Sequence, residues 1–223
     1  MSQTKRGFSE KAATSGTVSA RLETERLVLR RFAEEDAENL FGLDSDPQVM
    51  RFLSGGTPTP RAVVESDILP LFMRRDDRYP GYGFWAAIEK ASGDFVGWFS
   101  FRPTSGADPC EVSLGFRLRR DAWGKGYATE GARVLIRLGF TKWGVQRVVA
   151  TTYQDNLASR RVLEKVGMAL TRSFRMTAED LNRIDTYHVP SQDLWDGDDV
   201  EYALLKADWE RRHSAAHSQT ENA

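Results

Sequence analysis

Apolar and polar residues follow two periodicities along this chain, and together they predict a mixed α/β protein. Short apolar runs that contain β-branched residues are typical of strands, and apolar residues at helical spacing are typical of helices. The predicted strands cover residues 23–32, 84–89, 95–102, 111–118, 148–153, 168–176 and 200–206. The predicted helices cover residues 34–43, 60–72, 128–140 and 157–166. We therefore expect about seven strands with helices between them.

Prolines mark several predicted boundaries. Asp46-Pro47 is expected to end the first helix, and Thr59 with Pro60 to begin the second. Pro70 lies inside that second helix and is expected to kink or break it, because proline lacks the N–H that helical hydrogen bonding needs.

The strand at 111–118 alternates strictly, so its two faces should differ. One face carries Val112, Leu114, Phe116 and Leu118, and the other carries Glu111, Ser113, Gly115 and Arg117. A glycine-containing turn and an amphipathic helix follow this strand directly.

Both ends of the chain are poor in residues that could be buried. We expect residues 1–20 and 211–223 to be disordered tails around a single domain at 21–210. His213 and His217 are four residues apart, but no third ligand is near them, so we predict no metal site. The role of residues 177–199, which include an acidic run from Asp193 to Asp199, is left open.

Composition and charge exclude several classes of protein. Hydrophobic residues make up 40% and charged residues 28%, as in ordinary globular domains. With 31 basic and 32 acidic residues the net charge is −1, so we expect no nucleic-acid partner. No apolar run is long enough to span a membrane, and no secretion signal is recognisable. The one cysteine, Cys110, cannot form an intramolecular disulfide, which fits a cytoplasmic location.

The turn Trp123-Gly124-Lys125-Gly126-Tyr127-Ala128 joins a strand to a helix and suits an anion. Small residues there let backbone N–H groups approach a phosphate, and the positive end of the helix dipole favours negative charge. About thirty residues later a second strand ends in a polar turn, where Asn156 can cap a helix that Gly167 closes.

Together these two segments resemble the GNAT superfamily of acetyltransferases. Its first motif is Gln/Arg-x-x-Gly-x-Gly/Ala, and its later motif is Asn-x-x-Ala/Ser before a helix that ends near Lys-x-Gly-Phe. The resemblance extends to the Rim-type branch, which includes ribosomal-protein amino-terminal acetylases, through residues 22–30, 46–50 and 199–205. Trp123 stands where many members have Gln or Arg, a departure that leaves the backbone grip intact.

The resemblance implies a fold and a cofactor. The fold is a central, mixed, mostly antiparallel twisted sheet flanked by helices, in which the fourth and fifth strands (111–118 and 148–153) are parallel and splay apart. Acetyl-CoA would lie in that opening. The implied cofactor-binding residues are Phe116, Arg117 and Leu118 for the pantetheine arm, Trp123, Gly124, Lys125, Gly126, Tyr127 and Ala128 for the pyrophosphate, and Asn156 and Ser159 on the second helix. Arg160 or Arg161 would reach a phosphate, or lie on a solvated face.

The resemblance also suggests catalytic roles. Glu111 is the candidate base that accepts the proton of the attacking amine, directly or through water, and the amide of Leu118 would stabilise the oxyanion. The family often has a tyrosine as general acid where this chain has Leu163, so Ser159 becomes the candidate for assisting thiolate departure. Direct attack is preferred to an acetyl-Cys110 intermediate, because no histidine lies near Cys110 in the sequence.

Three functions are compatible with these residues. The first is acetylation of a primary amine, with a protein or peptide amino terminus as acceptor. The second is acetylation of a small amine such as an aminoglycoside or polyamine, and the third is a non-catalytic acyl-CoA-binding sensor. Whether the protein forms a homodimer is not determined by the sequence.

Overall fold

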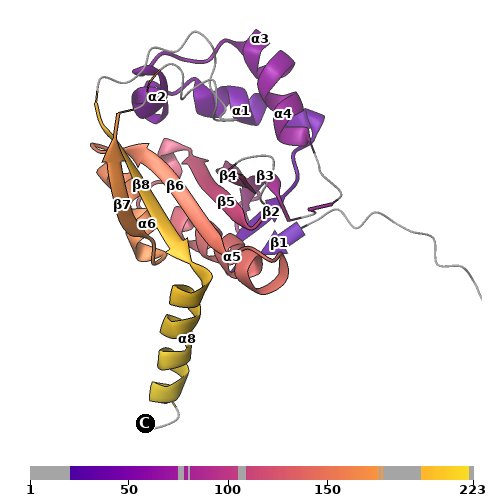
Figure 1. The fold of residues 1–223 in the computed structure, drawn as a ribbon. Coiled ribbons are helices and arrows are strands. Elements are labelled where there is room, and N and C mark those ends of the chain that lie inside the picture. The colour runs from indigo at the N-terminus through magenta and orange to yellow at the C-terminus, as the bar shows by residue number, and fades with distance from the viewer. Residues whose placement is uncertain are drawn as a thin grey trace, which may run out of the picture.

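A computed structural model of the chain describes residues 21–74, 78–79, 81–104, 109–175, 177 and 197–220, the last six of these without their side chains (Figure 1). The strands are β1 (Arg21–Glu23), β2 (Leu27–Arg30), β3 (Gly83–Glu89), β4 (Phe95–Pro103), β5 (Glu111–Leu118), β6 (Arg147–Tyr153), β7 (Ala169–Phe174) and β8 (Asp199–Leu205). The α-helices are α1 (Ala37–Asp44), α2 (Pro47–Ser54), α3 (Arg61–Val63), α4 (Leu69–Met73), α5 (Tyr127–Lys142), α6 (Leu157–Lys165) and α8 (Lys206–Thr220). Short 3₁₀ turns, η1 (Glu34–Asp36) and η3 (Arg120–Ala122), and a π-helical turn, η2 (Val64–Ile68), complete the elements.

The strands form one sheet in the order β1-β2-β3-β4-β5-β6-β8-β7. The pair β5 and β6 is parallel and the other neighbouring pairs are antiparallel. This confirms the mixed, mostly antiparallel sheet expected from the sequence. The sheet has eight strands where about seven were expected, because the sequence did not predict β1, which shares only Glu23 with the strand predicted at 23–32 and pairs with β2.

The central strands β3 and β4 are buried on both faces, which explains their near-continuous apolar sequence. On β3, Phe84 and Ala86 pack with residues of α1, η2 and α4, whereas Trp85 and Ala87 belong to the cluster that α5 and α6 cover. Figure 1 shows α1 to α4 gathered on one side of the molecule. The sheet therefore separates two hydrophobic clusters.

Asp46-Pro47 begins a helix, and the expectation that it only ends the preceding one missed α2. The Asp46 side chain accepts a hydrogen bond from the Gln48 amide at 2.8 Å, and Pro47 is the first residue of α2. An aspartate cap followed by proline is a favoured helix start, and Gly55 closes α2 with φ of +64°. The same dipeptide both separates α1 from α2 and initiates α2.

Pro70 distorts the second predicted helix without ending it. The helical run begins after Pro60, which is the cap and not the first helical residue, and continues as α3, η2 and α4. The widened turn η2 lies immediately before Leu69 and Pro70. Because proline offers no N–H and its ring crowds the carbonyl four residues earlier, local widening to a π-turn accommodates it.

The last described element is helix α8, which covers residues 211–220 of the segment expected to be a tail, and Figure 1 shows it extending away from the sheet. Its first turns are attached to the domain. Trp209 contacts Phe140 with ring centroids 5.7 Å apart, and Arg212 donates to the Gly167 carbonyl at 2.6 Å. Residues 1–20, 221–223 and most of 177–199 lie outside the described part, and of the acidic run only residues 197–199 are described. Within the described residues, no helix is long and apolar enough to cross a membrane.

A buried carboxylate, Asp36, attaches β2 to the start of α1. Arg30 donates to both of its oxygens, at 2.6 and 2.8 Å, and the Ala33 amide and Asn39 side chain donate at 3.0 and 2.9 Å. Burial alone raises the pKa of Asp36, but the hydrogen bonds from Arg30, Ala33 and Asn39 outweigh it and leave the pKa below its ordinary value. The stability that this charge contributes is therefore present above the unfolded-state pKa of about 3.9 and is lost as the pH falls through the lower folded-state pKa.

We expect Asp36→Asn to lower the free energy of unfolding at pH 7 by about 2 kcal/mol, because it weakens a buried charge-assisted network. Urea denaturation at pH 7 and at pH 3 would measure this, and the difference from the parent should shrink at the lower pH. The exposed Asp67→Asn is the control, with an expected change below about 0.5 kcal/mol. An equal loss at both pH values would mean that the shape of the side chain matters and its charge does not.

Candidate functional site

Strands β5 and β6 are paired at one end and separate at the other. The parallel register runs Glu111↔Arg147, Val112↔Val148 and Ser113↔Val149, and then stops. β5 continues for five residues beyond Ser113, to Leu118, and β6 continues to Tyr153. A wedge therefore opens between residues 114–118 and residues 150–153, as expected from the sequence.

Two helices begin at the open end of the wedge. Because β5 and β6 are parallel, their carboxyl ends lie at the same edge of the sheet, and α5 and α6 each start just after them. The amino-terminal ends of both helices therefore carry partial positive charge near the mouth of the wedge. An anionic ligand with an extended arm would find backbone amides and an open edge of β5 at one place.

The glycine turn adopts a conformation that few other residues could. Gly124 has φ of +73° and Gly126 has φ of +85°, both in the left-handed region. Gly126 is the cap of α5 and offers no side chain to satisfy the first amides of the helix. An added Cβ at Gly124 would lie in open space, so at this position a ligand can approach the backbone closely.

The residues expected to hold the pantetheine arm lie on the half of β5 that pairs with β4 but not with β6. Phe116 is half-buried against Phe99, and the buried side chain of Arg117 binds Asp44 at 2.6 Å on the opposite face. The Leu118 carbonyl accepts a hydrogen bond from the Trp123 ring nitrogen at 2.8 Å. Trp123 itself is 47% exposed, so its ring fastens the turn to the strand and still presents surface to a ligand.

Helix α6 places its candidate residues, Asn156 and Ser159, beside the same mouth of the wedge. The Asn156 Oδ1 atom accepts from the Ser159 amide at 3.2 Å and caps α6, which leaves the Asn156 NH₂ group as the part that could contact a ligand. Arg160 donates to Tyr202 and to the Gln154 carbonyl, so its guanidinium is used within the fold. Leu163, where the family often has tyrosine, is buried in the core.

Glu111 lies at the paired end of the wedge, within a row of charges that crosses three strands. Its Oε1 atom accepts from Thr104 at 2.9 Å, and its Oε2 atom accepts from Arg147 at 2.5 Å. Arg147 also lies 3.4 Å from Glu201 of β8. Glu111 lies at the start of β5, whereas Ser159 lies on α6. At about 3.3 Å per residue, Glu111 is roughly 7 Å along β5 from Ser113, the last residue of β5 that pairs with β6.

Sequence reasoning did not identify Thr104 and Arg147 as partners of Glu111, or Glu201 as the second partner of Arg147. The alternation of β5 indicated which face Glu111 occupies, but Thr104 follows β4, Arg147 is on β6 and Glu201 is on β8. Only the observed strand order and register bring them together.

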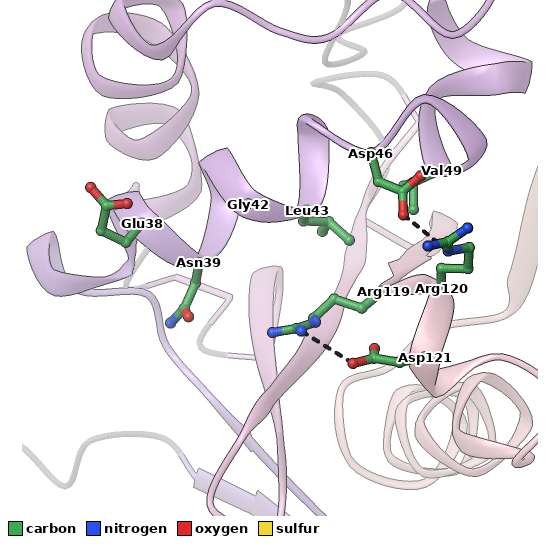
Figure 2. Close-up of a pocket in the computed structure, with 9 residues that line it drawn as sticks. All are labelled: Glu38, Asn39, Gly42, Leu43, Asp46, Val49, Arg119, Arg120 and Asp121. Atoms are coloured by element: carbon green, nitrogen blue, oxygen red, sulfur yellow. Dashed lines mark hydrogen bonds and ion pairs between the residues drawn. The ribbon is translucent and has the colours of Figure 1, made fainter.

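A recess of about 280 Å³ lies between helices α1 and α2 and the residues that follow β5. Figure 2 shows Arg119 paired with Asp121, and Arg120 paired with Asp46, at 3.1 and 3.3 Å. Arg119 is six residues beyond Ser113, which corresponds to about 20 Å along the strand direction. The recess therefore adjoins the glycine turn and is remote from the paired end of the wedge.

The described residues include no candidate set of metal ligands. Among the residues that the structure describes, no group of three or more His, Cys, Asp or Glu side chains could hold a metal ion. His213 contacts the carbonyl of Trp209 on α8.

Comparison with known proteins identifies the class that this wedge and turn define. The acetyltransferase (GNAT) domain family matches residues 26–169, so the chain belongs to the GNAT acetyltransferases. It is accordingly an acetyl-CoA-dependent acyltransferase.

One relative is the FsC-acetyl coenzyme A-N(2)-transacetylase of Aspergillus fumigatus, which is 31% identical over 199 residues, 85% of this chain and 78% of the relative. Among solved structures, a GNAT-family acetyltransferase from Bacillus anthracis superposes with a TM-score of 0.65 and 23% identity, covering 84% of this chain and 99% of its own. The ribosomal-protein-S5-alanine acetyltransferase from Vibrio fischeri superposes with a TM-score of 0.63 and 15% identity, covering 85% and 98%. At such identities the two structures bear on the fold alone.

Proposed function

We propose that this enzyme moves the acetyl group of acetyl-CoA to a primary amine by direct attack. The observation that carries the proposal is the wedge between β5 and β6 with two helix starts at its mouth. The edge of β5 that faces away from β4 has no pairing with β6 beyond Ser113, and through Phe116 to Leu118 it can bond the amide groups of the pantetheine arm as an added strand would. The amides of residues 124–128 can bind the pyrophosphate, with Trp123 beside them.

In the proposed reaction the amine nitrogen attacks the thioester carbon, an N–C bond forms and the C–S bond breaks. The amine proton passes to Glu111, directly or through water. The coenzyme A thiolate needs little help to leave, since its thiol has a pKa of about 8.5, and the Ser159 hydroxyl is our candidate for assisting its departure.

A covalent route through Cys110 is the less favoured alternative. Cys110 is exposed and lies next to Glu111, but the histidine that the structure describes, His213, is on α8. We therefore favour direct transfer.

For the acceptor we propose the amino terminus of a protein or peptide. Residues 22–30, 46–50 and 199–205 support it, because they resemble the Rim-type branch. A small-molecule amine is the second candidate, and it is favoured by the 31% identity to a relative whose name describes transfer to an N(2) position. The two candidates differ in the size of the acceptor, which a direct screen can resolve.

We expect acetyl-CoA consumption with one class of acceptor when the purified protein is screened against amino-terminal peptides and small amines. Thiol release would be followed with a disulfide reagent, and the acetylated position would be located by mass spectrometry. The parent should also gain thermal stability from acetyl-CoA, since a ligand that binds the folded state stabilises it by mass action. Tight binding without turnover on any acceptor would instead support a non-catalytic acyl-CoA sensor.

A further inference from the structure

Two segments about a hundred residues apart meet beside the glycine turn. Arg26, just before β2, bonds the carboxylate of Glu130 on α5 through its Nε and Nη2 atoms, at 2.8 and 2.7 Å. The Arg26 amide and the Thr24 hydroxyl donate to the other oxygen, Oε1, at 2.8 and 2.5 Å. The β1–β2 turn is thus clamped to the first turn of α5.

Glu130 is held in its charged form at this position. Burial raises its pKa, but hydrogen bonds from Thr24 and from the backbone and side chain of Arg26 outweigh burial and leave the pKa below its ordinary value. A carboxylate that accepts this many hydrogen bonds anchors Arg26 in one orientation. The plane of the Arg26 guanidinium also lies over the Tyr127 ring, 4.7 Å from its centroid.

Arg26 also hydrogen-bonds the backbone of the glycine turn. Its Nη1 atom donates to the Lys125 carbonyl at 2.9 Å, and its Nη2 atom lies 3.4 Å from where a Cβ on Gly126 would be. The Lys125 carbonyl and the Gly126 N–H belong to one planar trans peptide unit, so they point in opposite directions. Holding the carbonyl toward Arg26 therefore turns the Gly126 N–H away from Arg26.

We propose that Arg26, anchored by Glu130, is a positioning residue that presets the peptide plane between Lys125 and Gly126 for phosphate binding. The inference rests on the proposed binding of the acetyl-CoA pyrophosphate at residues 124–128. Arg26 acts by orienting a backbone donor before the ligand arrives, which reduces the cost of ordering the turn on binding. It bonds the turn and makes no contact with the reacting atoms.

The test compares Arg26→Ala, Arg26→Lys and Glu130→Gln with the parent by calorimetric titration of acetyl-CoA. We expect a loss of affinity of about tenfold for Arg26→Ala, the usual size for one charge-assisted hydrogen bond. Arg26→Lys should bind acetyl-CoA nearly as weakly, because an ammonium group cannot bond the Glu130 carboxylate and the Lys125 carbonyl in the same plane. Arg21→Ala, in the exposed pair with Glu23 on the same hairpin, is the matched control and should bind like the parent.

Turnover separates positioning of the phosphate turn from a general structural role. With the acceptor found by screening, kcat at saturating acetyl-CoA should change by less than about threefold while KM rises, as for lost ground-state binding. With S-acetylpantetheine, which lacks the phosphates, Arg26→Ala and the parent should have the same kcat/KM. Combining Arg26→Ala with Glu130→Gln should cost no more affinity than Arg26→Ala alone, because both act through one clamp.

Three outcomes would overturn the inference. Full recovery of affinity in Arg26→Lys would indicate a direct charge contact with phosphate, an equal loss with S-acetylpantetheine would indicate general destabilisation, and parent-like affinity in Arg26→Ala would remove the role. Measuring Gly124→Glu in the same titrations separates failure of the positioning role from failure of the proposed phosphate site. If Gly124→Glu binds acetyl-CoA as the parent does, the phosphate assignment fails. If Gly124→Glu loses binding while Arg26→Ala keeps it, only the positioning role of Arg26 fails.

Discussion

Gly124→Glu should weaken acetyl-CoA binding by at least about a hundredfold, equivalent to about 2.8 kcal/mol. The substituted side chain would occupy the open space beside Gly124 and place a carboxylate against the proposed pyrophosphate site. Two like charges about 4 Å apart near a protein surface repel by about 4 kcal/mol, so charge alone can account for this loss. Titration calorimetry, or the thermal shift caused by acetyl-CoA, would measure it.

Gly144→Glu is the matched control for this experiment. Gly144 has φ of +77° against +73° for Gly124, and an added Cβ at either position meets nothing within 4 Å. Both substitutions therefore carry the same backbone strain, but Gly144 follows α5 and is remote from the turn that begins it. Equal losses of affinity in the two variants would refute the location of the phosphate site.

Glu111→Gln should lower kcat at neutral pH by about a hundredfold and leave the affinity for acetyl-CoA nearly unchanged. Glutamine keeps the shape and the contact with Thr104 but cannot accept a proton, and a positioned base typically contributes at least this factor. An α-amino acceptor with a pKa of about 7.7 to 8.0 supplies more free amine as the pH rises, so the deficit should narrow toward high pH. Initial rates at pH 6.5 to 9.5 would show this.

Glu201→Gln is the control for the loss of charge. Glu201 faces the same Arg147 guanidinium, at 3.4 Å, but lies on β8 beyond β6, one strand farther from the wedge. Its rate should stay within about tenfold of the parent, since a positioning effect is smaller than the loss of a base. If Glu111→Gln lowers kcat by the same factor at every pH, Glu111 only positions other groups, and bulk water is the acceptor of the amine proton.

Much of the site could be predicted because its features are local in the sequence. Gly124 and Gly126 indicate a turn that needs positive φ, and Asn156 indicates a helix cap. Both features depend on neighbouring residues and not on distant parts of the chain. The alternation of β5 likewise reports its two faces, because side chains of a strand point to opposite sides in turn. The wedge itself was expected only from the resemblance of these segments to the GNAT acetyltransferases, and the strand pairing bears it out.

Local signals failed where one residue type has two structural meanings. Asp46-Pro47 both ends one helix and begins another, and only the packing of Val49 and Met50 in the core shows that α2 exists. Pro70 predicted a kink or a break, and only the structure decides between them: Leu69 and Phe72 on either side of it are buried, and the chain stays helical through a π-turn.

The sequence by itself determined the sheet-forming segments, the glycine turn and the helix that follows it, because each depends on interactions within a few residues. The tertiary structure alone decided what surrounds them. Arg26 reaches Glu130 across 104 residues, and Glu111 reaches Arg147 across 36. Such pairs depend on strand order and register, which are set by the burial of both sheet faces together and leave no signature in the spacing of the charged residues themselves.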